Sequence, residues 1–161
     1  MGFLVSIEKG INMEDWTTAM VAYPAPIVGD EGHVTVEYLG ESNLVGATKE
    51  EIADAVRPFA GQGEFEVPVI GIRLFGVKTG SPVWVAQLDS ADLTPIYESV
   101  VSALEAIGVE NASSYADEEY KPHVTIKPFE SYSDLDEFKD FPSTVTLGPL
   151  QVWWNNERFD V

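Results

Sequence analysis

The chain has 161 residues, of which 45% are hydrophobic, and this length and composition suit one domain with a substantial core. It contains no cysteine, which excludes disulfides, thiol catalysis and cysteine-bound metal. Its 27 acidic and 9 basic residues give a net charge of -18, and a field of that sign disfavours binding of duplex DNA or long RNA. We therefore expect a single domain over residues 1–161, with any phosphate-bearing partner small or bound at one end.

No run of about eighteen apolar residues is present, so no membrane-spanning helix and no membrane partner are expected. Residues 1–7 lack the basic start and the apolar length of a secretory signal. With the absence of cysteine, this favours a cytoplasmic protein, and we expect a monomer. The two histidines have no obvious carboxylate partner, so neither a metal nor another cofactor is expected. The acidic charge fits a soluble surface or adaptation to high salt as well as it fits a functional role.

Alternating hydrophobic residues bounded by turn residues predict strands along most of the chain. Two segments instead have helical spacing. One begins at Thr48, which forms a capping-box pattern with Glu51, and the other begins at Leu93 and stops at Gly108. A weaker helix is predicted over residues 133–138, and the polar loop 110–119 is expected to be mobile. The predicted strands cover residues 19–23, 33–39, 65–75, 83–88, 123–128, 144–147 and 150–154.

The two halves of the chain repeat a short motif. His33-Val-Thr-Val returns as His123-Val-Thr-Ile, 123 - 33 = 90 positions later, and each copy is followed by a helical stretch and further strands. Repeated units of this kind tend to pair about an approximate two-fold axis, which would bring the two motif strands together. The other matched segments are 20–22 with 84–86, and 67–75 with 145–153.

Side chains at alternate positions of a strand share a face, so His33 projects with Thr35, and His123 with Thr125. A single strand histidine is more often a packed or surface residue, but here both histidines of the chain begin the same motif. Two imidazoles in one cleft suit phosphodiester cleavage, since one can take the proton of the attacking water while the other protonates the leaving oxygen. The threonine hydroxyls would donate to the non-bridging phosphoryl oxygens. We therefore expect these four residues to be catalytic, without a metal.

The paired motifs resemble the 2H phosphoesterase superfamily, the LigT-like proteins known as RNA 2′,3′-cyclic phosphodiesterases or 2′-5′ RNA ligases. The likeness lies in His33-Val-Thr-Val-Glu-Tyr-Leu-Gly and Pro122-His-Val-Thr-Ile, and with the repeat it covers about residues 17–155. It implies an α+β fold with two lobes, in which two antiparallel sheets face each other across a cleft and helices lie outside. Family members commonly have a helix before the first motif, whereas only Pro24–Gly32 is available here, so the resemblance implies nothing about substrate size.

Three further residues are predicted to bind substrate from positions next to the motifs. Continued alternation would place Glu37 and Lys127 on the cleft face, where Lys127 would hold a phosphate oxygen and Glu37 would pair with it or orient a histidine. The alternative for both is an exposed strand charge. Tyr120, with Lys121, would gate the entrance, and a plain loop role is the alternative.

Three other predicted substrate-binding residues lie on the later strands. If the second face of those strands lines the cleft, Arg73 would bind a phosphate. Phe75 or Trp153 would then provide a platform on which a base stacks. Ordinary packing is the alternative for both aromatic residues.

Three functions fit these observations. The first is an enzyme that opens 2′,3′-cyclic phosphates or cleaves 2′-5′ or cyclic oligonucleotide linkages. The second is a viral or phage enzyme of the same chemistry, active in the host cytoplasm, which degrades cyclic oligonucleotide immune signals; such small substrates suit an acidic surface. The third is a non-catalytic nucleotide-binding module. Two complete motifs argue against the third, because binding alone does not need two histidines.

Overall fold

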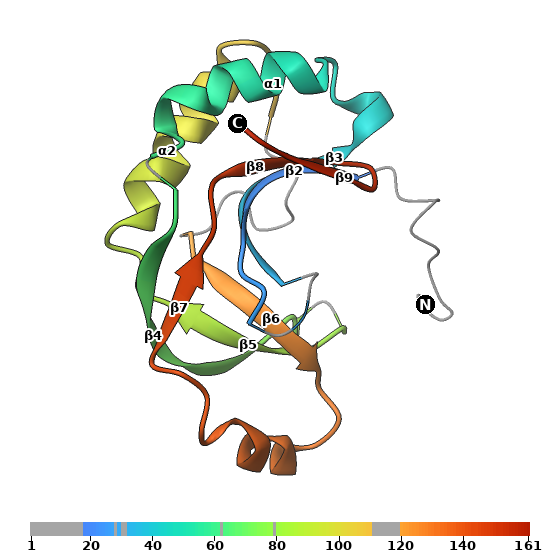
Figure 1. Cartoon of the computed structure of the whole chain (residues 1–161). Coiled ribbons are helices and arrows are strands. Elements are labelled where there is room, and N and C mark those ends of the chain that lie inside the picture. Colours follow the sequence, from blue (N-terminus) through green and yellow to red (C-terminus); the bar gives the residue numbers. More distant parts are fainter. Residues whose placement is uncertain (1–17, 28, 30–31, 62, 79, 111–119) are drawn as a thin grey trace.

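The computed structural model describes residues 18–27, 29, 32–61, 63–78, 80–110 and 120–161 (Figure 1). Over this part of the chain, eight strands form one antiparallel sheet in the order β7-β4-β5-β6-β3-β2-β8-β9. The α+β class is confirmed. Apart from Glu110, the loop predicted to be mobile lies outside the described residues. The strands are β2 (Thr18–Pro24), β3 (His33–Glu41), β4 (Phe65–Phe75), β5 (Val83–Leu88), β6 (His123–Pro128), β7 (Thr144–Leu147), β8 (Gln151–Trp154) and β9 (Glu157–Asp160).

The strand order is symmetric about its centre, where the motif strands β3 and β6 are neighbours. The repeat matches β2 with β5, and β4 with the segment that contains β7 and β8. In the sheet, β5 and β2 flank the motif strands, and β4 and β8 lie one place further out. Each half therefore contains strands from both repeats, because β4 pairs with β5 and β8 pairs with β2. The edge strand β9 falls outside the repeat.

The resemblance implied two separate sheets, but the two halves are joined into one. The link is backbone pairing between β3 and β6 at Val34 and Val124. Both motif strands are thus central strands, and the residues on either side of this pair lie close to the middle of the sheet.

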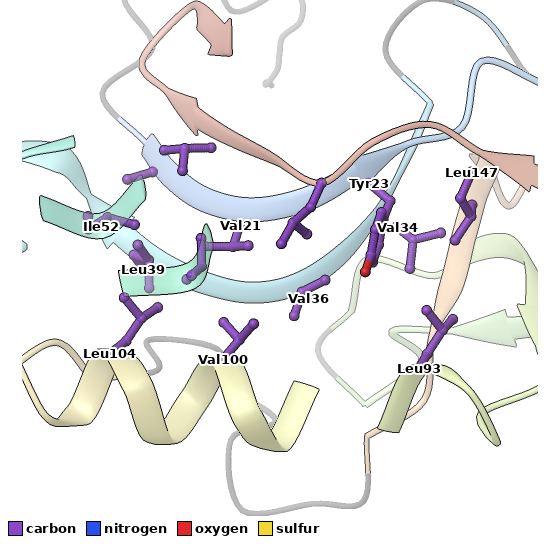
Figure 2. Close-up of a cluster of buried hydrophobic side chains, with 14 of the residues drawn as sticks. Val21, Tyr23, Val34, Val36, Leu39, Ile52, Leu93, Val100, Leu104 and Leu147 are labelled. Carbon is purple, nitrogen blue, oxygen red and sulfur yellow. The ribbon is translucent and has the colours of Figure 1, made fainter. Parts of the chain in front are cut away.

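Two helices, α1 (Lys49–Val56) and α2 (Leu93–Glu105), pack on one face of the sheet (Figure 1). The capping box predicted at Thr48 is present, and Gly108, with a φ of 84°, follows the end of α2. Figure 2 shows aliphatic side chains of β2 and β3 facing those of α2, including Val100 and Leu104. Because the helices cover this face of the sheet, a functional site on the central strands would lie on the opposite face. The 3-10 helices are η2 (Ser42–Leu44), η3 (Arg57–Phe59) and η4 (Tyr132–Phe138).

A β-bulge interrupts β3 directly after its motif threonine. Thr35 pairs with Ala22, and Glu37 pairs with Val21, so Val36 is the additional residue. Because Ala22 and Val21 are neighbours in β2, they point to opposite faces. Thr35 and Glu37 therefore also point to opposite faces, although they are two positions apart.

The same irregularity occurs at the equivalent place in β6. Thr125 pairs with Val85, and Lys127 pairs with Trp84, which makes Ile126 the additional residue. Thr125 and Lys127 are consequently on opposite faces of the sheet. Each motif strand thus presents its histidine and threonine to one face and then turns its next polar residue away.

Candidate active site

The four motif residues lie together at the centre of the sheet. Val34 pairs with Val124 in antiparallel strands, so the residue before one lies opposite the residue after the other. His33 therefore lies opposite Thr125, and Thr35 lies opposite His123. Electrostatic repulsion from His33 is one of the causes that lower the pKa of His123, as expected for two imidazoles on neighbouring strands.

His123 is partly buried. Its ring makes an edge contact with the ring of Phe75, with 4.8 Å between centroids. Burial lowers the pKa of His123, the backbone hydrogen bond to Lys121 opposes part of this shift, and repulsion from His33 adds a smaller lowering. That bond joins Nδ1 to the Lys121 carbonyl oxygen at 2.8 Å, so in the neutral ring Nδ1 carries the hydrogen and Nε2 the lone pair.

His33 packs against Trp153, with 4.6 Å between the ring centroids. Trp153 is only 3% exposed, and its Nε1 donates a hydrogen bond of 2.9 Å to Oε1 of Gln151. The guanidinium of Arg158, from β9, lies over the Trp153 ring at 4.0 Å from its centroid. The tryptophan is therefore a fixed support between a histidine of the motif and an arginine of the edge strand.

The two halves place an aromatic ring beside each histidine. Phe75 and Trp153 are matched by the repeat, and they contact His123 and His33 respectively. These contacts place both rings on the face that carries the motif histidines. Stacking of a base on Trp153 is contradicted, because its ring is covered; packing, the alternative, is the observed role.

Arg73 also lies on the motif face. It pairs across β5 with Val85, which in turn pairs with Thr125. Its side chain extends over Gly71, where a Cβ atom would collide with the guanidinium. Gly71 pairs with Gln87, and Gln87 pairs with His123, so these three residues form one row across the sheet. The guanidinium of Arg73 therefore lies at the end of the row that contains His123.

The predicted position of Glu37 was wrong. The bulge at Val36 turns Glu37 toward the helices, where it is 1% exposed. Neither carboxylate oxygen has a hydrogen-bond partner within the described part of the chain. Burial and then repulsion from Glu105 of α2 raise the pKa of Glu37 to about 7.

The predicted position of Lys127 was also wrong, for the same reason. The bulge at Ile126 directs Lys127 away from Thr125 and toward η4. Its ammonium lies 3.2 Å from a carboxylate oxygen of Glu130, 3.5 Å from one of Glu137 and 3.8 Å from one of Asp134. Three carboxylates neutralise this lysine, which leaves it unsuited to hold a phosphate.

Tyr120 does not gate a cleft. Its ring stacks on that of Tyr97 in α2, with 4.3 Å between centroids, and it packs against the hydrophobic core. Its hydroxyl donates a hydrogen bond of 2.7 Å to the backbone carbonyl of Thr35. Tyr120 thus ties the start of β6 to β3.

Within the described ranges, no group of three or more histidine, cysteine, aspartate or glutamate side chains is arranged to hold a metal ion. In the same ranges, no helix is both long and apolar enough to cross a membrane.

Comparison with solved structures identifies the fold. A structure described as a phosphoesterase matches with a TM-score of 0.51 and 13% identity, over 84% of this chain and 86% of the other. The structure of E. coli LigT complexed with 3′-AMP matches with a TM-score of 0.50 and 14% identity, over 86% of this chain and 87% of LigT. The chain has the LigT fold. No protein-family model matches the sequence, and a search of curated proteins found no match.

Within this LigT fold, sequence reasoning missed two residues on the motif face. Arg158 was missed because β9 was not predicted, although Asn155, with a φ of 58°, and Asn156 are a recognisable hairpin turn after β8. Gly71 was passed over as an ordinary strand residue. A glycine inside a strand can indicate the close approach of another group, and here that group is the side chain two positions on.

Proposed function

We propose that this protein is a phosphodiesterase that hydrolyses small nucleotide substrates by acid-base catalysis between His33 and His123. The observation that carries the proposal is the pairing of β3 with β6, which puts both His-Val-Thr motifs on one face at the centre of the sheet. The likeness to a phosphoesterase and to LigT supports it at the level of the fold.

In this mechanism His123 is the general base and His33 the general acid. His123 fits the role of base because its lowered pKa keeps the ring neutral near neutral pH, with the lone pair on Nε2. It takes a proton from water as the water oxygen bonds to phosphorus. Protonated His33 gives its proton to the leaving oxygen as the phosphorus–oxygen bond breaks.

Thr35, Thr125 and Arg73 complete the proposed site. The threonine hydroxyls donate hydrogen bonds to the non-bridging oxygens of the phosphoryl group. The guanidinium of Arg73 offers a planar pair of donors to the same group from the His123 side. No step of this scheme uses a metal ion.

The substrate class proposed here is a 2′,3′-cyclic phosphate, or a 2′-5′ or cyclic oligonucleotide linkage. E. coli LigT in its complex holds 3′-AMP, a small nucleotide, which supports a substrate of this size. Degradation of cyclic oligonucleotide immune signals by a viral or phage enzyme uses the same chemistry. A panel of cyclic mono-, di- and trinucleotides with 2′-5′ oligoadenylate distinguishes these substrates.

The test of the proposal is turnover by two single variants. His33→Ala and His123→Ala should each lower kcat by at least about a hundredfold, because each removes one proton-transfer group. Thr35→Val and Thr125→Val should each slow the reaction by roughly a hundredfold or less. Unchanged kcat in either histidine variant, with an unchanged melting temperature, contradicts the mechanism.

A chelation experiment tests the metal-independent part. Activity should be the same after dialysis against EDTA as before it, since protons and hydrogen bonds perform each step. Loss of activity in EDTA, with recovery on addition of zinc or manganese, would refute this part of the proposal.

A further inference from the structure

The motif residue Thr35 is held by contacts on both sides of the sheet. From the side of the helices, the hydroxyl of Tyr120 donates a hydrogen bond of 2.7 Å to its backbone carbonyl oxygen. On the motif face, the hydroxyl of Thr35 donates to the sulfur of Met20, with 3.7 Å between oxygen and sulfur. One contact restrains the peptide plane and the other restrains the side-chain rotamer.

The Tyr120 hydroxyl is a fixed donor. Its ring stacks on that of Tyr97 in α2, with 4.3 Å between centroids and 2° between the planes, and it packs against the hydrophobic core. Burial, and then the nearby Tyr23 and Tyr97, raise the pKa of Tyr120 above the ordinary value of 10.0. The hydroxyl therefore keeps its proton, and its bond to Thr35, over the pH range in which two histidines can catalyse.

The carbonyl that accepts this bond lies where the bulge of β3 begins. Val36 is the additional residue of the bulge, so the peptide between Thr35 and Val36 is the one at which the strand leaves its regular pairing. Bulges beside active sites change the direction of side chains. Because Tyr120 contacts this peptide, it restrains the direction in which the Thr35 side chain points.

The contact with Met20 leaves the Thr35 hydroxyl available to a substrate. A thioether sulfur is a weak acceptor, so a charged phosphoryl oxygen would displace it. Met20 belongs to a small apolar cluster with Ala22 and Trp153, and Ala22 is the residue that pairs with Thr35. The hydroxyl is thus already directed to the motif face before a substrate binds.

We infer that Tyr120 is a positioning residue for the proposed reaction and that it acts through Thr35. Its hydroxyl holds the Thr35 peptide so that the threonine hydroxyl meets a non-bridging phosphoryl oxygen as negative charge develops there. The inference rests on the proposed function and adds to it a residue outside the motifs, on the side of the helices, that does not touch the substrate. A small displacement of Thr35 weakens a bond that matters most in the transition state, so the effect should be on kcat.

Tyr120→Phe removes the hydroxyl and keeps the ring that stacks on Tyr97. The substrate is the member of the nucleotide panel that wild type cleaves fastest. For this substrate, kcat should fall by roughly threefold to thirtyfold, while KM changes by less than about twofold. Wild-type kcat in Tyr120→Phe would overturn the inference, even with a lower melting temperature, because the hydroxyl would then have only a structural role.

Tyr132→Phe is the matched control, because it removes the hydroxyl of a tyrosine that is 70% exposed. Its kcat and KM should equal those of wild type. A fall in kcat as large as that of Tyr120→Phe would overturn the inference, since loss of any tyrosine hydroxyl would then have the same effect.

A double-mutant cycle tests whether the effect passes through Thr35. In a Thr35→Val background, Tyr120→Phe should lower kcat by less than about twofold, because the hydroxyl that it positions is already absent. In a Thr125→Val background, it should lower kcat by nearly its full factor. Equal factors in both backgrounds would overturn the inference, because Tyr120 would then act on the whole site and not through Thr35.

An NMR measurement separates this inference from the proposed function, because it needs no turnover. Three-bond couplings between the α and β protons should show one rotamer for Thr35 in wild type and a mixture of rotamers in Tyr120→Phe. If wild type cleaves no member of the panel, the proposed function fails, and the couplings still decide whether Tyr120 fixes Thr35. If wild type cleaves the panel and the couplings of Thr35 are the same in both proteins, the inference alone fails.

Discussion

The ring of Phe75 contributes to the environment that keeps His123 neutral. Burial is the largest cause of the lowered pKa of His123, so removal of this ring should allow water to reach the imidazole. In Phe75→Ala, the acidic limb of the kcat/KM profile should move to higher pH, toward the ordinary histidine value of about 6.5. The measurement is the pH–rate profile together with an NMR titration of the imidazole protons.

The control for this prediction is Phe129→Ala, which removes a ring from beside Trp84 and not from beside a histidine. Its acidic limb should match that of wild type. A Phe75→Ala profile with the wild-type acidic limb would show that the ring does not set the protonation state of His123.

Glu37 links protonation to stability. Its folded-state pKa of about 7 exceeds the ordinary value of 4.5, so the folded protein holds this proton more tightly than the unfolded chain does. The contribution to stability is present at low pH and is lost as the pH rises from 4.5 to about 7. At roughly 1.4 kcal/mol for each pKa unit, the full effect is on the order of 3 kcal/mol.

Glu37→Gln removes this dependence. The free energy of unfolding of the variant, relative to wild type, should increase by on the order of 2 to 3 kcal/mol between pH 5 and pH 8. Urea unfolding at both pH values measures it, with Glu66→Gln, at an exposed position of β4, as the control. An equal difference at both pH values would mean that Glu37 is not the residue that titrates.

Gly71 provides the space that the Arg73 guanidinium occupies. A Cβ atom there would collide with the flexible end of Arg73, and its φ is not in the left-handed region, so alanine displaces the side chain without straining the backbone. Gly71→Ala should lower kcat/KM by roughly tenfold, about as much as Arg73→Gln. The double variant should be little worse than either, and additive losses would show that the two residues act separately.

At the scale of secondary structure, the lysine of β6 belongs to a cluster with η4. Asp134 accepts hydrogen bonds from Nε1 of Trp84 and from two backbone amides, and its carboxylate attracts Lys127. Lys127→Met should therefore change kcat/KM by less than about threefold while lowering the melting temperature. A large fall in kcat/KM without loss of stability would contradict this prediction and would show that Lys127 contributes to catalysis or substrate binding.

The motif strands explain how far the sequence predicts the site. Alternation correctly grouped His33 with Thr35, and His123 with Thr125, because it was applied over two positions. It failed one step later, at Glu37 and Lys127, because a bulge changes which face the following residues point to. No glycine lies within residues 33–37 or 123–127 to indicate a bulge, so the pattern alone does not predict it.

Some strands were predicted with their observed bounds, and one strand was not predicted. Strands β4 to β7 have the predicted bounds, since hydrophobic alternation and flanking turn residues agree there. The edge strand β9 was missed because its four residues include two acids and an arginine, a composition that suits exposed edges and gives little alternation. The joining of two halves into one sheet depends on pairing between distant residues, which the repeat suggests but does not specify.

At the scale of the whole molecule, charge limits substrate size. A net charge of -18 opposes the approach of polyanions, and the opposition grows with each phosphate brought near the surface. Short cyclic or 2′-5′-linked nucleotides should therefore be cleaved much faster than structured RNA, and moderate salt should not inhibit, because it screens the repulsion. Steady-state rates at several salt concentrations measure this.

A preference for tRNA-sized substrates would contradict this prediction, as would binding that falls steeply with salt. Either result would require a basic track along the surface, since counterion release is what makes nucleic-acid binding depend strongly on salt.

The shortest backbone ladder of the sheet lies at its centre, between β3 and β6. Among the described residues, β2 and β3 share seven residue pairs, whereas β3 and β6 share one. The Tyr120 hydroxyl adds a second link at the Thr35 carbonyl. We predict that the two halves move relative to each other at this short ladder, and that a phosphate bound between the imidazoles reduces the motion. Amide hydrogens of Val34 and Val124 should then exchange quickly in the free protein and slowly once ligand is bound.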